Sequence, residues 1–116
     1  MTDSQESIDE RLRALKQAYR DGLPGKIGEI DALAASIRHD PGSEKGRQGL
    51  DALYHLVHKL AGSGGTFGLP EISDAAQLVE DACEALEKTP SADGWQNIEG
   101  LIEELRRAVN AALKQG

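Results

Sequence analysis

Apolar residues recur at spacings of three and four along almost the whole chain, and no stretch alternates between apolar and polar as a strand does. This spacing places apolar side chains on one face of a helix. Joints rich in glycine, proline or small polar residues separate the stripes. The five stripes cover residues 8–19, 27–37, 50–61, 72–86 and 95–112. The pattern predicts an all-α protein.

The first stripe predicts a short N-terminal helix over about residues 5–21. Ser7 and Glu10 have the spacing of a capping box near its start. Two glycines and a proline within residues 22–25 are expected to end it. The second stripe then opens a new helix, which Pro-Gly at residues 41–42 stops.

Later joints carry further helix-start signals. Pro70 suits the first turn of a helix, where its missing N–H costs nothing. Thr89, followed by Pro90, has the pattern of an N-cap for the last helix. Four amphipathic helices with short links, over about residues 25–114, favour an antiparallel four-helix bundle with the additional N-terminal helix packed on it. We expect one domain spanning residues 1–116.

Composition narrows the function classes. With 39% hydrophobic but only 3% aromatic residues, the core must consist mainly of Leu, Ile, Val and Ala. The net charge of −7 argues against a nucleic-acid partner, because nucleic acid phosphates need a basic surface. No apolar run approaches the roughly 20 residues that span a membrane, and the polar N-terminus is neither a signal nor a transit peptide. These features favour a cytoplasmic protein, and Met1 favours a complete chain.

No sequence motif marks a pocket-based active site. The chain has no G-x-x-x-x-G-K-[ST] phosphate loop, no H-E-x-x-H, no Cys-x-x-Cys and no G-x-S-x-G. A chain of 116 residues has no room for an ATP-binding kinase domain beside the bundle, so no autonomous catalytic site is expected. Cys83 falls on a core stripe and is expected to be an inert buried thiol, and Trp95 is expected to cap one end of the core.

The histidines are the strongest candidates for surface chemistry. His39 follows the second stripe, where a helix end favours a capping or solvated role. His55 and His58 lie three residues apart on the third helix and share a face. His58 is rotated by about 100° from Val57 of the core stripe. It should therefore lie at the edge of the buried face.

Glycines follow His58 on the same flank. Gly62, one turn later, would leave the imidazole beside bare backbone, and Gly65 extends this open surface. Each glycine lowers helix stability by roughly 0.5–1 kcal/mol relative to alanine. Close approach of another protein to the helix would explain why glycines stand at these positions despite this cost. A neutral imidazole is a nucleophile suited to in-line group transfer. Two alternatives remain. The histidine pair could be solvated and have no role, or His55 and His58 could form a metal site, although no third ligand is evident.

The segment from His58 to Ser63 reads His-Lys-Leu-Ala-Gly-Ser, and Gly68 follows five residues later. It resembles the His-x-Leu-Lys-Gly-Ser signature of histidine-containing phosphotransfer (HPt) domains, which lies on the second helix of their four-helix bundle. The resemblance implies that His58 is phosphorylated and that Gly62 keeps its surroundings open. It further implies that Lys59 balances phosphoryl charge and that Ser63 either hydrogen-bonds near the imidazole or packs in the bundle.

The resemblance also implies a docking face. His55 and Gly65 would contact the partner, with Leu56 or Leu69 at the border. One position departs from the family: Ala61 stands where a lysine is common. The missing cation would weaken phosphohistidine stabilisation or alter partner choice. Similar sequences with alanine at this position resemble HPt modules attached to response regulators and hybrid kinases.

By resemblance, the chain is a phosphorelay intermediate. His58 would accept a phosphoryl group from a receiver-domain phosphoaspartate and pass it to another receiver domain. The partners would be response-regulator receiver domains and a hybrid sensor histidine kinase; the receiver would bring Mg²⁺, and the chain itself needs no cofactor and no metal. The alternative is an interaction domain that docks on a receiver without transfer. A monomer is expected, since no stripe extends beyond what one bundle buries.

Overall fold

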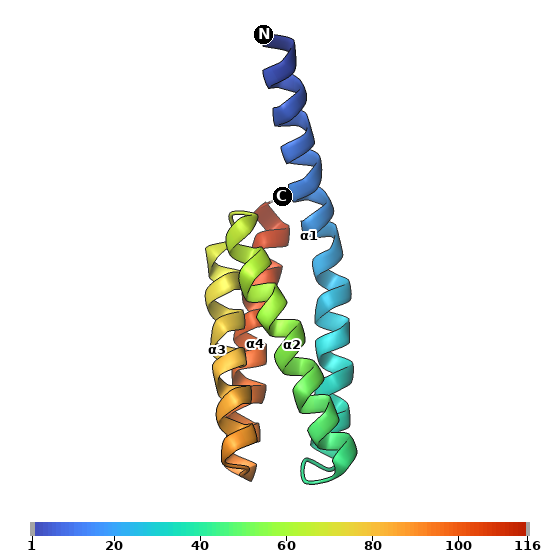
Figure 1. Ribbon diagram of the computed structural model, residues 1–116, viewed down its shortest axis with the longest axis vertical. Helices are drawn as coiled ribbons and strands as arrows, with labels where there is room; N and C mark the ends of the chain where they lie inside the picture. The colour runs from blue at the N-terminus through green and yellow to red at the C-terminus, as the bar shows by residue number, and fades with distance from the viewer. Residues whose placement is uncertain (1, 116) are drawn as a thin grey trace.

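The computed structural model describes the backbone of residues 2–115 and the side chains of residues 5–115. Its four helices run alternately up and down, as Figure 1 shows. They are α1 (Thr2–His39), α2 (Glu44–Thr66), α3 (Pro70–Lys88) and α4 (Ala92–Gln115). Residues 2–115 form no strand. The prediction of an all-helical antiparallel bundle is confirmed.

The helices form a closed ring around one apolar core. α2 packs between α1 and α3, α3 packs on α4, and α1 closes the ring against α4. Aliphatic side chains fill the core, and Trp95 and Cys83 are buried in it as expected. Burial, with Glu87 and Glu80 nearby, raises the pKa of the Cys83 thiol to about 12, so the thiol is protonated and unreactive at neutral pH. No helix within residues 2–115 is both long and apolar enough to cross a bilayer.

The first two predicted helices are one. α1 is continuous over 38 residues with Pro24 inside it, so the predicted break at residues 22–25 is wrong. Proline removes one backbone donor, but its fixed φ suits a helix, and Leu23 and Ile30 anchor α1 to the core just before and after it. The glycines at 22 and 25 keep negative φ and do not turn the chain. The predicted capping box fails too, because Ser7 lies inside the helix.

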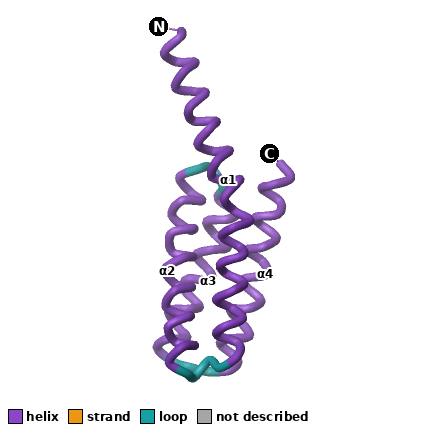
Figure 2. The backbone as a smooth tube through the Cα atoms, turned by 90° about the vertical axis from the view of Figure 1, so that its right-hand side faces the viewer, coloured by secondary structure: helices purple, strands orange, loops and turns teal. Residues whose placement is uncertain are grey.

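The N-terminal part of α1 projects past the other helices instead of packing on them, as Figures 1 and 2 show. Ile8, Leu12 and Leu15 are 50%, 51% and 55% exposed. Contact with the bundle begins at Tyr19, whose ring stacks on Phe67 with centroids 4.5 Å apart. The prediction that this segment packs as an additional helix is therefore wrong. The reason for expecting a monomer also fails, because a stripe does extend beyond the bundle.

The helix ends follow local capping rules. Ser43 caps α2 by accepting a hydrogen bond from the Gly46 N–H at 2.9 Å, and Pro70 begins α3 as predicted. Thr89, predicted to cap α4, lies instead at the C-terminal end of α3. Ser91 takes the N-cap role, since its Oγ accepts from the Gly94 N–H at 2.9 Å. Serine is as good a cap as threonine and lies directly before the helical run, so the start shifts by two residues.

The continuous α1 makes a testable prediction about Pro24, which is exposed inside it. Because proline costs about 3 kcal/mol relative to alanine in a helix interior, Pro24→Ala should raise the free energy of unfolding by about 1–3 kcal/mol in a denaturant titration. Pro70→Ala is the control: at the first turn of α3 it should change stability little. A loss of stability in Pro24→Ala would instead indicate a turn at this position.

Candidate functional site

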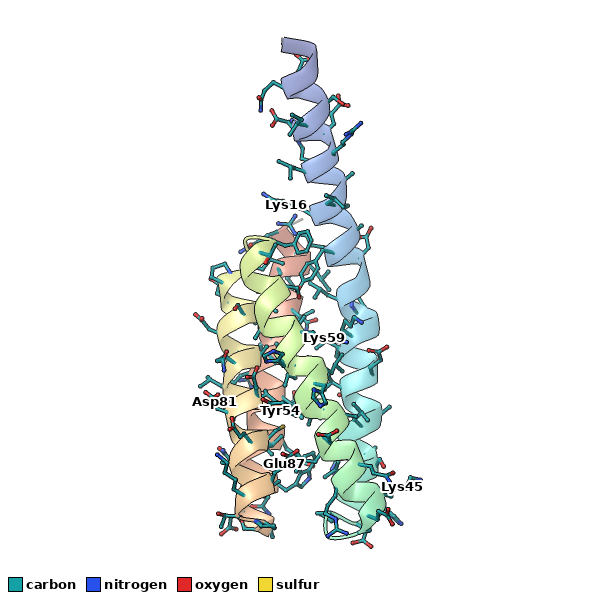
Figure 3. All side chains as sticks on the ribbon, viewed as in Figure 1. Lys16, Lys45, Tyr54, Lys59, Asp81 and Glu87 are labelled. Atoms are coloured by element: carbon teal, nitrogen blue, oxygen red, sulfur yellow. The ribbon has the colours of Figure 1, made fainter. Side chains whose placement is uncertain are left out.

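His58 lies on α2 beside α3, and 63% of its side-chain surface is exposed. Its Nδ1 lies 2.9 Å from Oε1 of Glu80 on α3. The labelled Tyr54 and Asp81 mark this region of α2 and α3 in Figure 3. The imidazole therefore reaches solvent while one of its nitrogens is held by the neighbouring helix.

The Glu80 contact sets the tautomer of the imidazole. An ionised carboxylate only accepts hydrogen bonds, so in the neutral imidazole Nδ1 of His58 carries the hydrogen and Nε2 carries the free lone pair. Glu80 is itself only 8% exposed. Its second carboxylate oxygen lies 3.5 Å from the amide nitrogen of Gln77, which also donates to Asp81 at 3.0 Å. The site thus presents one unprotonated nitrogen from an oriented ring.

The two neighbours of His58 along the helix differ. Tyr54, one turn before, lies nearly parallel to the imidazole, with ring centroids 6.1 Å apart and an interplanar angle of 14°. Gly62, one turn after, has no atom within 4 Å of the position a Cβ would occupy. Burial, and after it the carboxylate of Glu80, raises the pKa of the Tyr54 phenol. The ring of His58 is thus supported on one side and open on the other.

His55 and Lys59 take different flanks of α2. The Nε2 of His55 lies 3.5 Å from Asp51 Oδ1, and its ring meets the edge of Tyr54 at a centroid distance of 5.3 Å. It shares the His58 flank without contacting Glu80. Lys59 lines a groove between α1 and α2 (Figure 3), so it lies on the flank turned away from α3. The structure does not bring it against the imidazole.

The segment formed by residues 62–65 helps α2 to pack on its neighbours and also leaves the surface beside His58 open. Ser63 Oγ hydrogen-bonds the Tyr19 hydroxyl at 2.8 Å, which ties α2 to α1 and matches the packing alternative for Ser63. A Cβ at Gly65 would make ordinary contact with Ser73 Oγ at 3.7 Å. At Gly64, a Cβ would lie only 3.0 Å from the backbone nitrogen of Ser73, so the absence of a side chain there allows α2 and α3 to approach closely.

The structure also places Leu56 and Leu69, which were expected to border the docking face, and Ala61, which stands where the family often has lysine. Leu69 is only 7% exposed and packs in the core, so little of it is left for a partner. Leu56 is half-buried and lines the groove beside α1. Ala61 is buried, and its carbonyl accepts a hydrogen bond from Ser73 Oγ at 2.5 Å. Among residues 5–115, no cluster of three or more His, Cys, Asp or Glu side chains could hold a metal ion.

Glu80 and Tyr54 are site residues that the sequence analysis missed. Tyr54 lies within the apolar stripe of residues 50–61, which by itself predicts only a core position. Glu80 stands beside Val79 of its stripe, where it looks like an ordinary surface acid. One signal was available: the turn between α2 and α3 centres near residue 69, so residues equally far from it, such as 58 and 80, face each other across the hairpin.

The family comparison agrees with this geometry. The family model described as Hpt domain matches residues 1–111. No curated protein and no solved structure matches the chain. The chain belongs to the Hpt domain family, which confirms the resemblance found in the sequence. Membership implies histidine phosphotransfer in phosphorelay signalling and interaction with receiver domains and kinases.

The Glu80 contact predicts the tautomer of His58 in solution. Nitrogen-15 NMR of the ring nitrogens at neutral pH should show His58 mainly as the Nδ1–H form. In Glu80→Ala this preference should be lost, because the carboxylate that holds the Nδ1 hydrogen is gone. Glu84→Ala removes an exposed carboxylate one turn further along α3 and should leave the spectrum of His58 unchanged. An Nε2–H form in the unaltered chain would contradict the assignment.

Proposed function

We propose that His58 is the phosphoryl carrier of a phosphorelay, accepting the group on Nε2 from a receiver-domain phosphoaspartate and passing it to another receiver domain. The observation that carries the proposal is the 2.9 Å contact between His58 Nδ1 and Glu80, which leaves an exposed, unprotonated Nε2 on a chain of the Hpt family. The donor receiver would belong to a hybrid sensor histidine kinase and the acceptor to a response regulator. The relay would operate in the cytoplasm.

The transfer balances without a further reactant. The Nε2 lone pair attacks phosphorus, a P–N bond forms, and the bond from phosphorus to the aspartate oxygen breaks, returning the carboxylate to the receiver. Because Nδ1 keeps its hydrogen, the phosphorylated ring is cationic, and the Glu80 carboxylate offsets this charge. In the second transfer an acceptor carboxylate attacks phosphorus, and the P–N electron pair returns to Nε2.

The partner supplies what this chain does not. Mg²⁺ and the cation that stabilise the moving phosphoryl group are expected on the receiver, and this chain supplies an oriented imidazole. The open surface at Gly62 lets the receiver reach Nε2, and His55 and Gly65 extend the docking face along the same flank. Lys59, on the other flank, contributes positive charge to the rim of the docked complex.

Docking without transfer is the second candidate, and Ala61 favours it. The common family lysine is missing at this position, and Ala61 is buried. A chain of this kind would bind a receiver through the same face while phosphate stays on the receiver.

Phosphotransfer from a labelled receiver distinguishes the two functions. Label should reach the unaltered chain and His55→Gln but not His58→Gln, because Glu80 holds Nδ1 of His58 and leaves its Nε2 free, whereas Nε2 of His55 faces Asp51. Receiver binding, measured by calorimetry, should persist in all three. If the unaltered chain binds the receiver and never takes up label, docking without transfer is the function. Label retained in His58→Gln would place the phosphoryl group elsewhere.

The open space at Gly62 makes a second prediction. Gly62→Leu should fold normally, since nothing lies within 4 Å of the position of its Cβ, but should slow transfer by about tenfold or more by keeping the receiver from Nε2. Gly100→Leu on α4 adds the same side chain at an equally open position and should transfer at the unaltered rate. Equal rates for the two variants would show that the receiver does not approach over Gly62.

A further inference from the structure

The projecting part of α1 carries an apolar stripe that the bundle leaves uncovered. We call residues 5–18 the overhang; it precedes Tyr19, where α1 first meets the bundle. Figures 1 and 2 show it extending past the turn between α2 and α3. Three large aliphatic side chains on one face are each about half exposed: Ile8, Leu12 and Leu15.

The spacing of this stripe is that of a coiled-coil seam. Ile8, Leu12, Leu15 and Tyr19 are separated by four, three and four residues, which is the alternation of heptad positions d and a. The seam is two rows wide, narrower than the apolar face of a helix buried in a bundle. Such a seam fits one further helix lying alongside the overhang.

The charges along the overhang select the partner. Residues 6–10 carry three carboxylates and no cation, whereas residues 11–18 carry three cations and no carboxylate. A second overhang lying parallel would place like charges together. An antiparallel second overhang places the acidic half of each helix beside the basic half of the other. The acidic half also makes the helix a poor ligand for an anionic membrane, which binds helices with a uniformly basic polar face.

We propose that the overhang pairs antiparallel with the overhang of a second copy of this chain, with Ile8 of each copy against Leu12 of the other. Beyond Tyr19 the bundle fills the side towards which the seam points, so the contact is confined to the overhang, about 21 Å long. A contact this short lies below the size of permanent interfaces, and the dimer is weak and reversible, with a Kd on the order of 10 µM to 1 mM. His58 lies outside the paired segment and stays accessible in both copies.

Sedimentation velocity of the full chain over a concentration series tests the pairing. The unaltered chain should pass from monomer to dimer, and Leu12→Glu should weaken the dimer at least tenfold, because it puts a charge into the seam. Leu78→Glu is the matched control: Leu78 on α3 is 53% exposed against 51% for Leu12, and this variant should dimerise normally. Circular dichroism confirms that both variants are folded. A chain that stays monomeric at about 1 mM, or equal loss in both variants, would overturn the proposal.

Salt and vesicles test the orientation and the identity of the partner. Raising NaCl from about 50 to 500 mM should weaken the antiparallel dimer, since opposite charges face each other across the contact. A dimer that strengthens with salt would be parallel and would contradict the proposal. Vesicle flotation tests whether the stripe binds lipid instead. The proposal would also be contradicted if the unaltered chain is monomeric in solution but floats with anionic phosphatidylserine vesicles, and Leu12→Glu abolishes this flotation.

Discussion

The close contact between α2 and α3 determines how His58 and Glu80 face each other. At Gly64 the two helices approach closely, since an added Cβ would lie only 3.0 Å from the backbone nitrogen of Ser73. Ser73 also donates to the Ala61 carbonyl, and Gly68 takes the positive φ of 74° that lets the chain reverse. These constraints fix how far α3 slides along α2. A shift by one turn would carry Glu80 about 5.4 Å away from His58 and leave the imidazole without its partner.

On the proposed function, the pairing of His58 with Glu80 would allow group transfer at the surface of the bundle. Phosphoryl transfer depends on position and charge more than on covalent catalysis by the protein. In the proposed transfer, Glu80, largely buried on α3, would supply both: it holds the His58 ring and would carry the negative charge that a phosphorylated, cationic ring needs. The rest of the apparatus is expected on the receiver. On this proposal, the open surface at Gly62 would give the receiver access to His58, and the buried carboxylate of Glu80 would orient the ring.

The sequence predicted the four-helix core and the place of His58 well, because both depend on local periodicity. It failed where tertiary contacts decide. Pro24 looked like a helix break, but core contacts on both sides of it keep α1 continuous, and the projecting stripe that results was not foreseen. Glu80 was missed because the apolar stripe of α3 does not mark it; only counting outward from the turn between α2 and α3 pairs it with His58. Ser63 was left between two roles, and only its contact with Tyr19 indicates packing.

The most direct test of the central claim is the position of the phosphoryl group on the phosphorylated chain, read from phosphorus–nitrogen couplings in NMR. The geometry predicts a single phosphohistidine with phosphorus bonded to Nε2 of His58, because Glu80 holds the Nδ1 hydrogen. Phosphorus on Nδ1 of His58, or on His55, would contradict the role assigned to the Glu80 contact and to the exposed nitrogen.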